Sequence, residues 1–363
     1  MNIWIMALEP LDTRYTGQWF HGIPALLKEE AANQGKHIKV INLAGEQTST
    51  ETTEGAFLNF TATNIWKNTQ VNALARFFAK GTVEAGDKIL FTDAWHSGIL
   101  QTKYMSELTD IPVEIHSLWH AGSYDPQDFL GRKIVDKRWT YSAERSYFFA
   151  SDFNYFATEF HKELFLEKLF RAQVPTDGLF LQPEDSKFVI SGQPHNVLIE
   201  KLQPFRNLKK RNLVLFPHRV APEKQPEIFR DLAQHMPDVE FVICQEKNLT
   251  KDEYHRLLGE AKIVFSANLQ ETLGISAMEG VLVDTLPMVP DRLSYSEMYY
   301  DTFKYPSAWT ESWDSYVKHR DQVIEWLRDL MENPLRGAIL PMQRAKLLED
   351  YLSAKPMINK LLG

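Results

Sequence analysis

Short apolar runs alternate with longer amphipathic stretches through the first half of the chain. Strand-like runs occupy residues 3–8, 38–43, 88–92, 113–116 and 155–157. Helix-like stretches lie between or after them, at residues 18–33, 65–79, 97–107 and 159–170. Strands that alternate with helices at this spacing predict βαβ units and a parallel sheet.

The second half of the chain repeats this alternation. Predicted strands lie at residues 212–216, 239–244, 262–266 and 286–289. Predicted helices lie at residues 222–235, 251–259, 274–283, 313–331 and about 342–361. An irregular, proline-containing stretch at residues 175–210 separates the two halves and is the expected domain boundary. The pattern predicts two doubly wound, Rossmann-like α/β domains at residues 1–200 and 201–341, with ligands outside the carboxyl ends of their strands.

Composition narrows the class of protein. The 363 residues, of which 44% are hydrophobic and 24% charged, fit two globular domains. One cysteine, Cys244, excludes an internal disulfide and indicates a reducing compartment. The N-terminal residues read as a strand rather than a signal peptide, and no apolar window is long enough for a membrane span. We therefore expect a cytoplasmic protein.

The net charge and its distribution along the chain indicate which partners the protein could bind. The net charge of −8 argues against a protein that coats nucleic acid by neutralising its phosphates. Two short basic runs could still be local docking surfaces, or they could be solvated faces. The first run is Arg132, Lys133, Lys137 and Arg138, and the second is Lys201, Arg206, Lys209, Lys210 and Arg211.

Candidate chemistry follows two strands of the second half. Glu271 lies in the loop before a helix that starts near Gly274, and Glu279 lies about two turns into that helix. The backbone N–H groups of Leu273, Gly274 and Ile275 would lie at the helix start, where such groups bind anions. Glu271 could hold a sugar and Glu279 a ribose; the alternative is that both are ordinary acids near a helix terminus.

Two cations, Arg219 and Lys224, follow the predicted strand at residues 212–216. Positive charge at this position would stabilise a diphosphate leaving group, on which negative charge grows as a glycosidic bond breaks. The alternative is a pair of surface charges. No Asp-x-Asp motif stands at a strand end, and the chain has neither G-x-G-x-x-G after the first strand nor H-E-x-x-H.

These residues carry a resemblance. The stretch from Glu271 to Glu279 resembles the E-x7-E motif of retaining GT-B glycosyltransferases of the GT4 type, with Leu273-Gly274 in place of the usual Phe-Gly. Arg219 and Lys224 match the Arg and Lys of that family. The resemblance implies a GT-B fold, catalysis without a bound metal, a leaving phosphate that takes the acceptor's proton, and a last helix at residues 342–363 that crosses back to the first domain.

Residues 214–298 are especially similar to the tRNA-queuosine mannosyltransferase branch of GT4. They share with it a Pro-His-Arg followed by Lys-x-Pro, and Pro-x-x-Leu-x-Tyr-x-Glu at residues 290–297. The sequence Asp284-Thr285-Leu286 departs from the usual Gly-Cys/Val-Pro of the family. Family frequency favours UDP-glucose as the donor, with a GDP-sugar as the other option.

The first half carries a looser similarity, to glycogen-synthase-like enzymes, around residues 91–98 and 114–122. The resemblance implies that His116 ends a strand and faces the transferred sugar, with His120 in reserve. It also makes Asp93 and His96 candidates for the acceptor side.

Two further candidates complete the predicted site. Trp119 is an aromatic candidate beside the acceptor, together with Trp95, Tyr124 and Trp139. Gly17 lies where the family has a glycine-rich loop, and it would let the backbone approach a ligand closely.

Three functions compete for this chain. The first is glycosyl transfer to a modified base in nucleic acid, either a hydroxymethylated pyrimidine in phage DNA or a queuosine-like tRNA base, held on aromatic faces after base flipping. The second is transfer to a carbohydrate or small-molecule acceptor, for which the basic runs would be solvated faces. The third, a non-catalytic sugar-nucleotide-binding module, is disfavoured by the presence of both acids and both cations.

Overall fold

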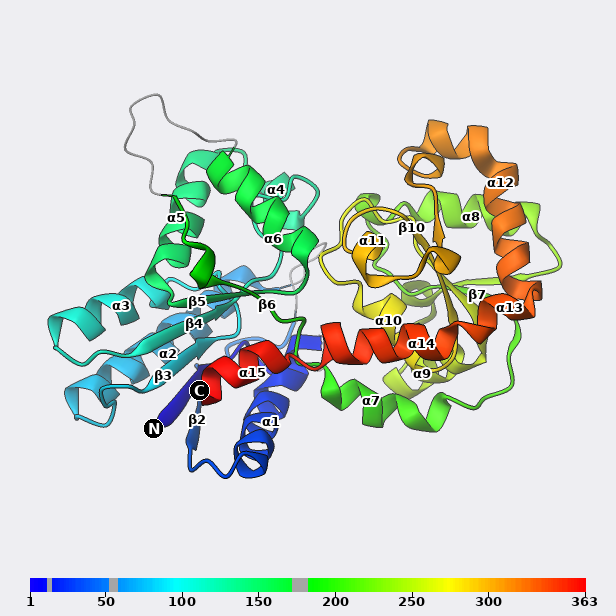
Figure 1. The fold of residues 1–363 in the computed structure, drawn as a ribbon. Coiled ribbons are helices and arrows are strands. Elements are labelled where there is room, and N and C mark those ends of the chain that lie inside the picture. The colour runs from blue at the N-terminus through cyan, green and yellow to red at the C-terminus, as the bar shows by residue number, and fades with distance from the viewer. Residues whose placement is uncertain (12–14, 52–57, 172–181) are drawn as a thin grey trace. The chain divides into compact units, whose positions relative to one another are not determined.

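The computed structural model describes residues 1–11, 15–51, 58–171 and 182–363. The chain forms two compact units (Figure 1). The first unit comprises Met1–Pro194 together with Ala354–Gly363, and the second comprises His195–Ser353. The first unit thus ends before residue 200, and Ala354–Gly363, rather than all of residues 342–363, join it.

The first unit is built on a six-stranded parallel sheet with strand order β2-β1-β3-β4-β5-β6. Its strands are β1 (Asn2–Met6), β2 (Lys39–Leu43), β3 (Lys88–Phe91), β4 (Glu114–Leu118), β5 (Phe153–Phe156) and β6 (Phe188–Ile190). Because β1 pairs with both β2 and β3, the winding of the chain reverses there. The loops after β1 and β3 therefore flank the topological switch point, where such sheets bind ligands.

Helices cover both faces of this sheet. They are α1 (Trp19–Asn33), α2 (Phe60–Ala79), α3 (Gly98–Leu108), α4 (Phe129–Lys133), α5 (Lys137–Ala150), α6 (Glu159–Leu166) and α15 (Lys355–Leu362). Ile3 and Ile5 of β1 pack in one core with Ile23 of α1 and Met357 of α15. Trp4, between them, belongs to the core of the opposite face. Because successive side chains of a strand point to opposite faces of the sheet, β1 contributes apolar side chains to the cores on both faces.

The second unit holds a five-stranded parallel sheet with strand order β11-β10-β9-β7-β8. Its strands are β7 (Arg211–Phe216), β8 (Glu240–Ile243), β9 (Ala261–Phe265), β10 (Leu286–Pro290) and β11 (Lys304–Tyr305). Its helices are α7 (Asn196–Leu202), α8 (Pro226–His235), α9 (Lys251–Glu260), α10 (Ile275–Leu282), α11 (Tyr295–Met298), α12 (Trp313–Glu332), α13 (Pro334–Ala338) and α14 (Leu340–Lys346). Because β7 pairs with both β8 and β9, the switch point of this sheet lies between β7 and β9.

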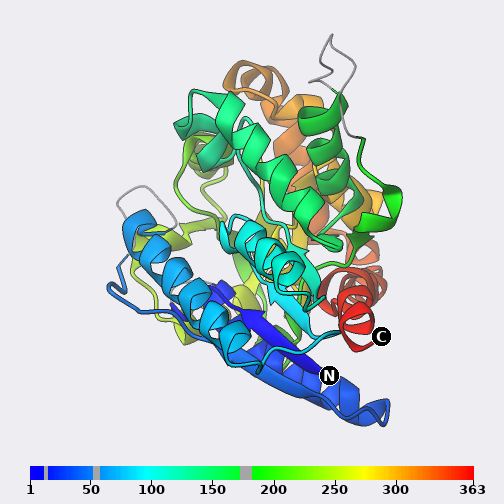
Figure 2. The same cartoon turned by 90° about the vertical axis from the view of Figure 1, so that its left-hand side faces the viewer.

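The end of the chain differs from one predicted helix at residues 342–361. A π-helical stretch, Leu347–Leu352, follows α14, and Ala354 adopts a left-handed conformation with φ 49° before α15 begins. The α15 helix packs beside α1 and β6 of the first unit, and it is drawn in red against that sheet in Figures 1 and 2. The expected return of the C-terminal helix is confirmed for α15. Across the described ranges, no helix has both the length and the apolar character of a bilayer-spanning segment.

Candidate active site

The switch point of the second sheet brings together three residues that the sequence singled out. Arg219 and Lys224 follow β7, and Glu271 follows β9, the strand that pairs with β7. Because both strands are parallel, their following loops emerge at the same edge of the sheet. Sequence spacing alone leaves these loops more than 40 residues apart.

A lysine–carboxylate pair forms the centre of this site. Lys224 is 6% exposed, and its Nζ donates to the carbonyl oxygen of Gln270 at 2.6 Å and lies 3.2 Å from Oε2 of Glu271. Burial by itself would raise the pKa of Glu271, but Lys224, His218 and the amide of Gly274 hold that pKa below its ordinary value. Glu271 is therefore ionised at neutral pH, and Lys224 is its counter-charge.

Two side chains fix the loop that carries Glu271. Gln225, in a left-handed conformation with φ 53°, donates from Nε2 to the carbonyl oxygen of Ala267 at 2.6 Å. Arg292 donates to the carbonyl oxygens of Ala267 and Asn268 at 2.8 and 2.7 Å. These bonds to main-chain oxygens hold the loop in place before any ligand binds. Arg292 lies in the family-like stretch at residues 290–297, but the sequence indicated no role for it.

Gly274 terminates this loop with φ +78°, directly before α10 begins at Ile275. A Cβ atom at this position would lie 2.6 Å from Cε1 of Tyr295, so both the backbone angle and the space require glycine. The backbone of Gly274 is one of the groups that lower the pKa of the Glu271 carboxyl. Anion binding by the amides of Leu273, Gly274 and Ile275 stays a prediction.

A pocket of about 320 Å³ opens beside the pair, between the loops that follow β7 and β8. Its lining is Pro217, His218, Arg219, Cys244, Gln245, Asn248, Leu249 and Tyr254. The guanidinium of Arg219 donates to Glu223 Oε1 at 2.9 Å, and its side chain is 41% exposed. Sequence reasoning missed Gln245, Asn248 and Tyr254, because no motif marks the loop after β8.

Glu279 joins this pocket through Tyr254. The Tyr254 hydroxyl donates to Glu279 Oε2 at 2.7 Å. Burial raises the pKa of Glu279 to about 7, although this hydrogen bond lowers it in part. Glu279 is therefore poised between its charged and neutral forms near neutral pH.

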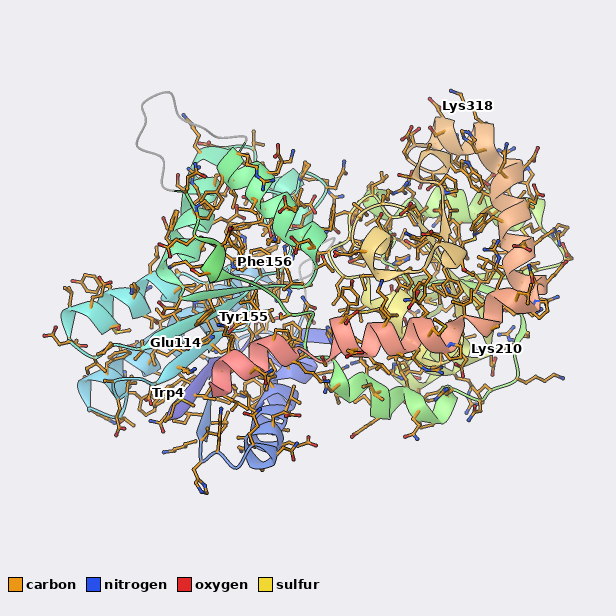
Figure 3. All side chains as sticks on the ribbon, in the orientation of Figure 1. Trp4, Glu114, Tyr155, Phe156, Lys210 and Lys318 are labelled. Carbon is orange, nitrogen blue, oxygen red and sulfur yellow. The ribbon has the colours of Figure 1, made fainter. Side chains whose placement is uncertain are left out.

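The structure corrects the role expected for His116. His116 lies in the middle of β4, fully buried, with Nδ1 2.6 Å from the Tyr155 hydroxyl and Nε2 2.7 Å from Glu114 Oε1. Glu114 begins β4 and pairs at 3.0 Å with Lys88, whose Nζ donates to the carbonyl oxygen of Lys360 in α15. The expectation that His116 ends its strand and faces a sugar is wrong, because its network lies at the amino ends of the strands (Figure 3).

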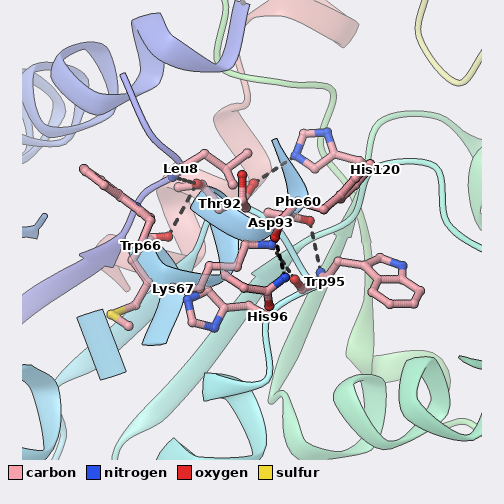
Figure 4. A network of polar contacts seen from close by, with 12 residues as sticks. Leu8, Phe60, Trp66, Lys67, Thr92, Asp93, Trp95, His96 and His120 are labelled. Carbon is pink, nitrogen blue, oxygen red and sulfur yellow. Dashed lines mark hydrogen bonds and ion pairs between the residues drawn. The ribbon is translucent and has the colours of Figure 1, made fainter. Parts of the chain in front are cut away.

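The loops after β3 and β4 carry a second polar cluster (Figure 4). Lys67 of α2 lies 2.7 Å from Asp93 Oδ2, and Nε2 of His120 lies 2.9 Å from the carbonyl oxygen of Thr92. Burial alone would raise the pKa of Asp93, but Lys67 and His120 hold it far below its ordinary value. His120, beyond the carboxyl end of β4, thus occupies the position that was expected of His116.

His96 is a structural residue in this cluster. Burial, reinforced by nearby Lys67, lowers the pKa of His96 to about 3, so its ring is neutral. Its Nδ1 accepts the N–H of Gly98 at 3.0 Å, at the first turn of α3. This hydrogen bond holds the His96 ring against the start of α3 and gives its Nδ1 atom a partner.

Two other expected acceptor-side residues are internal. Trp119 is fully buried, and its Nε1 donates to Asn154 Oδ1 at 2.8 Å within the core. Its predicted place beside the acceptor is wrong, and Tyr124, only 1% exposed, is buried as well. At Gly17, a Cβ atom would lie 2.2 Å from the carbonyl oxygen of Leu11, so the close approach there is to the chain's own backbone.

Two residues of the second basic run, Lys210 and Arg211, are bonded to other groups of the second unit. Arg211 begins β7 and forms ion pairs with Glu240 and Glu260, at the amino end of the strand. Lys210, which is labelled in Figure 3, donates to the carbonyl oxygen of Val283 and to the Thr285 hydroxyl. Arg219 and Lys224 follow the opposite, carboxyl end of β7.

Glu144 of α5 is a buried carboxylate beside the loops that follow β3 and β4. It accepts hydrogen bonds from Trp95 Nε1 at 2.9 Å and from the amide and hydroxyl of Ser123 at 2.7 and 2.8 Å. Despite these bonds, burial raises the pKa of Glu144 to about 7. Glu144 thus joins the loop after β3 to the loop after β4.

This pKa predicts a pH-dependent stability. Between about pH 4.5 and pH 7 the folded chain keeps the Glu144 proton, whereas the unfolded chain has released it. Protonated Glu144 therefore contributes fully to the free energy of unfolding below pH 4.5, and this contribution is lost as the pH rises through 7. Relative to wild type, the Glu144→Gln variant should gain about 3 kcal/mol in unfolding free energy from pH 4.5 to pH 7.5. Urea unfolding of both proteins at each pH measures this difference, and parallel curves would contradict it.

Comparison with known proteins places the fold. No protein-family model matches the chain, and no curated protein is similar to it in sequence. A glycosyltransferase from Rickettsia africae ESF-5 superposes with a TM-score of 0.58 at 12% identity, covering 99% of this chain and 96% of the other. The catalytic domain of starch synthase IV from Arabidopsis thaliana, bound to ADP and acarbose, gives 0.56 at 10% identity, with 99% and 97% covered.

A third solved structure agrees. HepE from Anabaena, in complex with UDP and glucose, gives a TM-score of 0.54 at 11% identity, covering 99% of this chain and 97% of the other. The chain has the GT-B fold. The predicted fold class, α/β with two Rossmann-like domains, is confirmed. At these sequence identities the likeness shows the fold alone.

Proposed function

We propose that this chain is a retaining glycosyltransferase of the GT4 type that moves a hexose from a nucleotide sugar to a hydroxyl acceptor. The observation that carries the proposal is the ionised Lys224–Glu271 pair at the switch point of the second sheet, beside a pocket of about 320 Å³. A paired acid and base at this edge suits a donor that is anionic at its diphosphate and polyhydroxylated at its sugar. The nucleotides in the starch synthase IV and HepE structures support a nucleotide-sugar donor.

The residues suggest a division of labour. The pocket between the loops after β7 and β8 would take the nucleoside, with Glu279 on the ribose hydroxyls. Lys224 and Arg219 would face the diphosphate, where cations stabilise the negative charge that develops on the leaving group. Glu271 would position the sugar by accepting hydrogen bonds from its hydroxyls.

The transfer step balances without an enzyme nucleophile. The acceptor oxygen bonds to the anomeric carbon on the face from which the phosphate departs, and the bond between that carbon and the phosphate oxygen breaks. The acceptor's proton passes to the leaving phosphate. Lys224 would act by its charge, in keeping with its ion pair to Glu271.

The titration of Glu279 gives a test of the nucleoside pocket. A charged carboxylate accepts two ribose hydroxyls, whereas the protonated form loses an acceptor. With a pKa of about 7, Glu279 should make UDP bind about tenfold more tightly at pH 8 than at pH 6. Calorimetric titration of wild type and Glu279→Gln with UDP measures the effect. An unchanged pH dependence in the variant would remove Glu279 from the pocket.

The acceptor that we propose first is a modified base in nucleic acid. Trp95 and Trp139 form an edge-to-face pair with centroids 6.3 Å apart, and Trp139 is 54% exposed beside the first basic run. Exposed aromatic faces beside positive charge suit single-stranded or flipped bases. The pairing of Arg206, Lys210 and Arg211 within the second unit favours the second candidate, a carbohydrate or small-molecule acceptor.

A transfer assay decides between these acceptors. Labelled UDP and GDP sugars would be offered with hydroxymethyluracil DNA, hydroxymethylcytosine DNA, unmodified DNA, bulk tRNA and simple glycans. We expect label in modified DNA or tRNA, lost in Glu271→Ala. Label only in glycans would support the second candidate, and no label from any donor would overturn the transferase proposal.

A further inference from the structure

The first unit repeats the topology of the second unit, so its own switch point lies between β1 and β3. Within the described residues, the loops after these strands carry the carboxylates of Glu9 and Asp93. One helix faces both: the Thr63 hydroxyl of α2 donates to Glu9 Oε1, and Lys67, one turn later, pairs with Asp93. The edge of this sheet therefore presents two acids over one helix, in the place where doubly wound sheets bind ligands.

The two acids differ in how far their hydrogen bonds are satisfied. Oδ1 of Asp93 accepts the amide of Trp95 at 3.0 Å, and Oδ2 accepts Lys67 Nζ at 2.7 Å. Glu9 is only 5% exposed, and its Oε2 has no hydrogen-bond partner within the described part of the chain. An unsatisfied buried acceptor is costly, most of all on an acidic group. Asp93 is thus complete without a ligand, and Glu9 is not.

The backbone around Glu9 is held in place. The amide of Leu8 donates to the Thr92 hydroxyl at 3.1 Å, and the amide of Leu11 donates to the carbonyl oxygen of Glu9 at 2.8 Å. Just before them, the carbonyl oxygen of Ala7 accepts hydrogen bonds from Trp66 Nε1 and Gln70 Nε2, both at 2.8 Å. The unpartnered oxygen therefore belongs to a side chain on a fixed backbone, whose other oxygen accepts the Thr63 hydroxyl.

We propose that Glu9 is an acceptor-binding residue whose Oε2 accepts a hydrogen bond from a hydroxyl or amino group of the acceptor. The inference rests on the proposed function, because the donor is assigned to the second unit and the acceptor to the first. The ligand class is a neutral, polyhydroxylated or amino-bearing group, such as a sugar or the polar edge of a nucleobase. Glu9 selects this group by polarity, since a carboxylate oxygen offers only acceptors.

Glu9→Gln tests the polarity directly. The amide oxygen can still accept the Thr63 hydroxyl, while the NH₂ group presents donors where the acceptor substrate needs an acceptor. With the acceptor found in the transfer assay, its KM should rise by about 10- to 100-fold, while kcat and the dissociation constant for UDP stay within about twofold of wild type. Glu114→Gln, at the amino end of the same sheet, is the matched control and should leave the acceptor KM unchanged.

A structural role gives a different result. If Glu9 only stabilises the fold, Glu9→Gln lowers the melting temperature, and the acceptor KM of the folded fraction equals that of wild type; this result would overturn the inference. Glu9→Asp, which keeps the charge on a shorter side chain, should show an intermediate KM. Binding of the free acceptor, followed by tryptophan fluorescence without donor, should weaken in Glu9→Gln. Wild-type protein that binds UDP but transfers no sugar would instead overturn the proposed function.

Discussion

Replacement of Lys224 by methionine is expected to reduce sugar transfer by about 10²- to 10³-fold, the loss seen when one group that stabilises a developing negative charge is removed. The Lys224 side chain is 7% exposed and lies 3.2 Å from Glu271. Its removal leaves a buried carboxylate without its counter-charge, which should also lower the unfolding free energy by about 3 kcal/mol. Initial rates at saturating donor and urea denaturation measure the two effects.

A double variant separates catalysis from stability. In Lys224→Met with Glu271→Gln, the uncompensated charge is gone, so most of the lost stability should return. Activity should not return, because neither the cation nor the carboxylate is present. A double variant that recovers transfer together with stability would show that the pair is structural. Lys318→Met, an exposed lysine in α12, is the control and should match wild type in both measurements.

The substitution Gly274→Ala is expected to have the second-largest effect. The left-handed backbone costs alanine about 1 kcal/mol, and the added Cβ would lie 2.6 Å from Tyr295 Cε1 and 3.4 Å from Glu271 Cγ. Relief of this overlap has to move Tyr295 or the start of α10, and with it Glu271. We expect a loss of about 2–4 kcal/mol in stability and at least a tenfold weaker binding of UDP.

Gly337→Ala is the matched control in the same unit. Gly337 lies in α13, and a Cβ there meets no atom within 4 Å. Because alanine is the better helix former, this variant should be neutral or more stable by up to about 1 kcal/mol. Equal melting temperatures and UDP affinities for the two variants would show that the geometry at Gly274 is not required.

Local sequence patterns were sufficient to predict much of the second unit. Strand–helix alternation predicts doubly wound sheets because each buried strand and each covering helix has its own apolar period. The approximate positions of Arg219, Lys224 and Glu271 at strand ends follow from the same pattern, and β7 and β9 are adjacent. The short strands β6 and β11 were not predicted, since three half-buried residues and a two-residue bridge carry too little periodicity.

In the first unit, local sequence patterns were not sufficient to place the candidate residues. His116 and His120 lie only four residues apart in the sequence. Because β4 ends at Leu118, His116 is buried within the strand and His120 lies beyond its end. Trp119 was expected beside the acceptor, but its side chain lies in the core and donates to Asn154. Strand limits at this precision depend on packing from α1, α15 and the opposite helical layer, which no local window contains.

The sequence by itself determined the fold class, the two-domain division and the candidate acids and cations of the second unit, because these depend on local periodicity and on residue type. The tertiary structure alone decided which groups are satisfied. It paired Lys224 with Glu271, bonded Lys210 and Arg211 to groups of the second unit, and left one oxygen of Glu9 without a partner among the described residues. Burial and hydrogen bonding arise between segments that are distant along the chain, and they determine the charge state of each site residue.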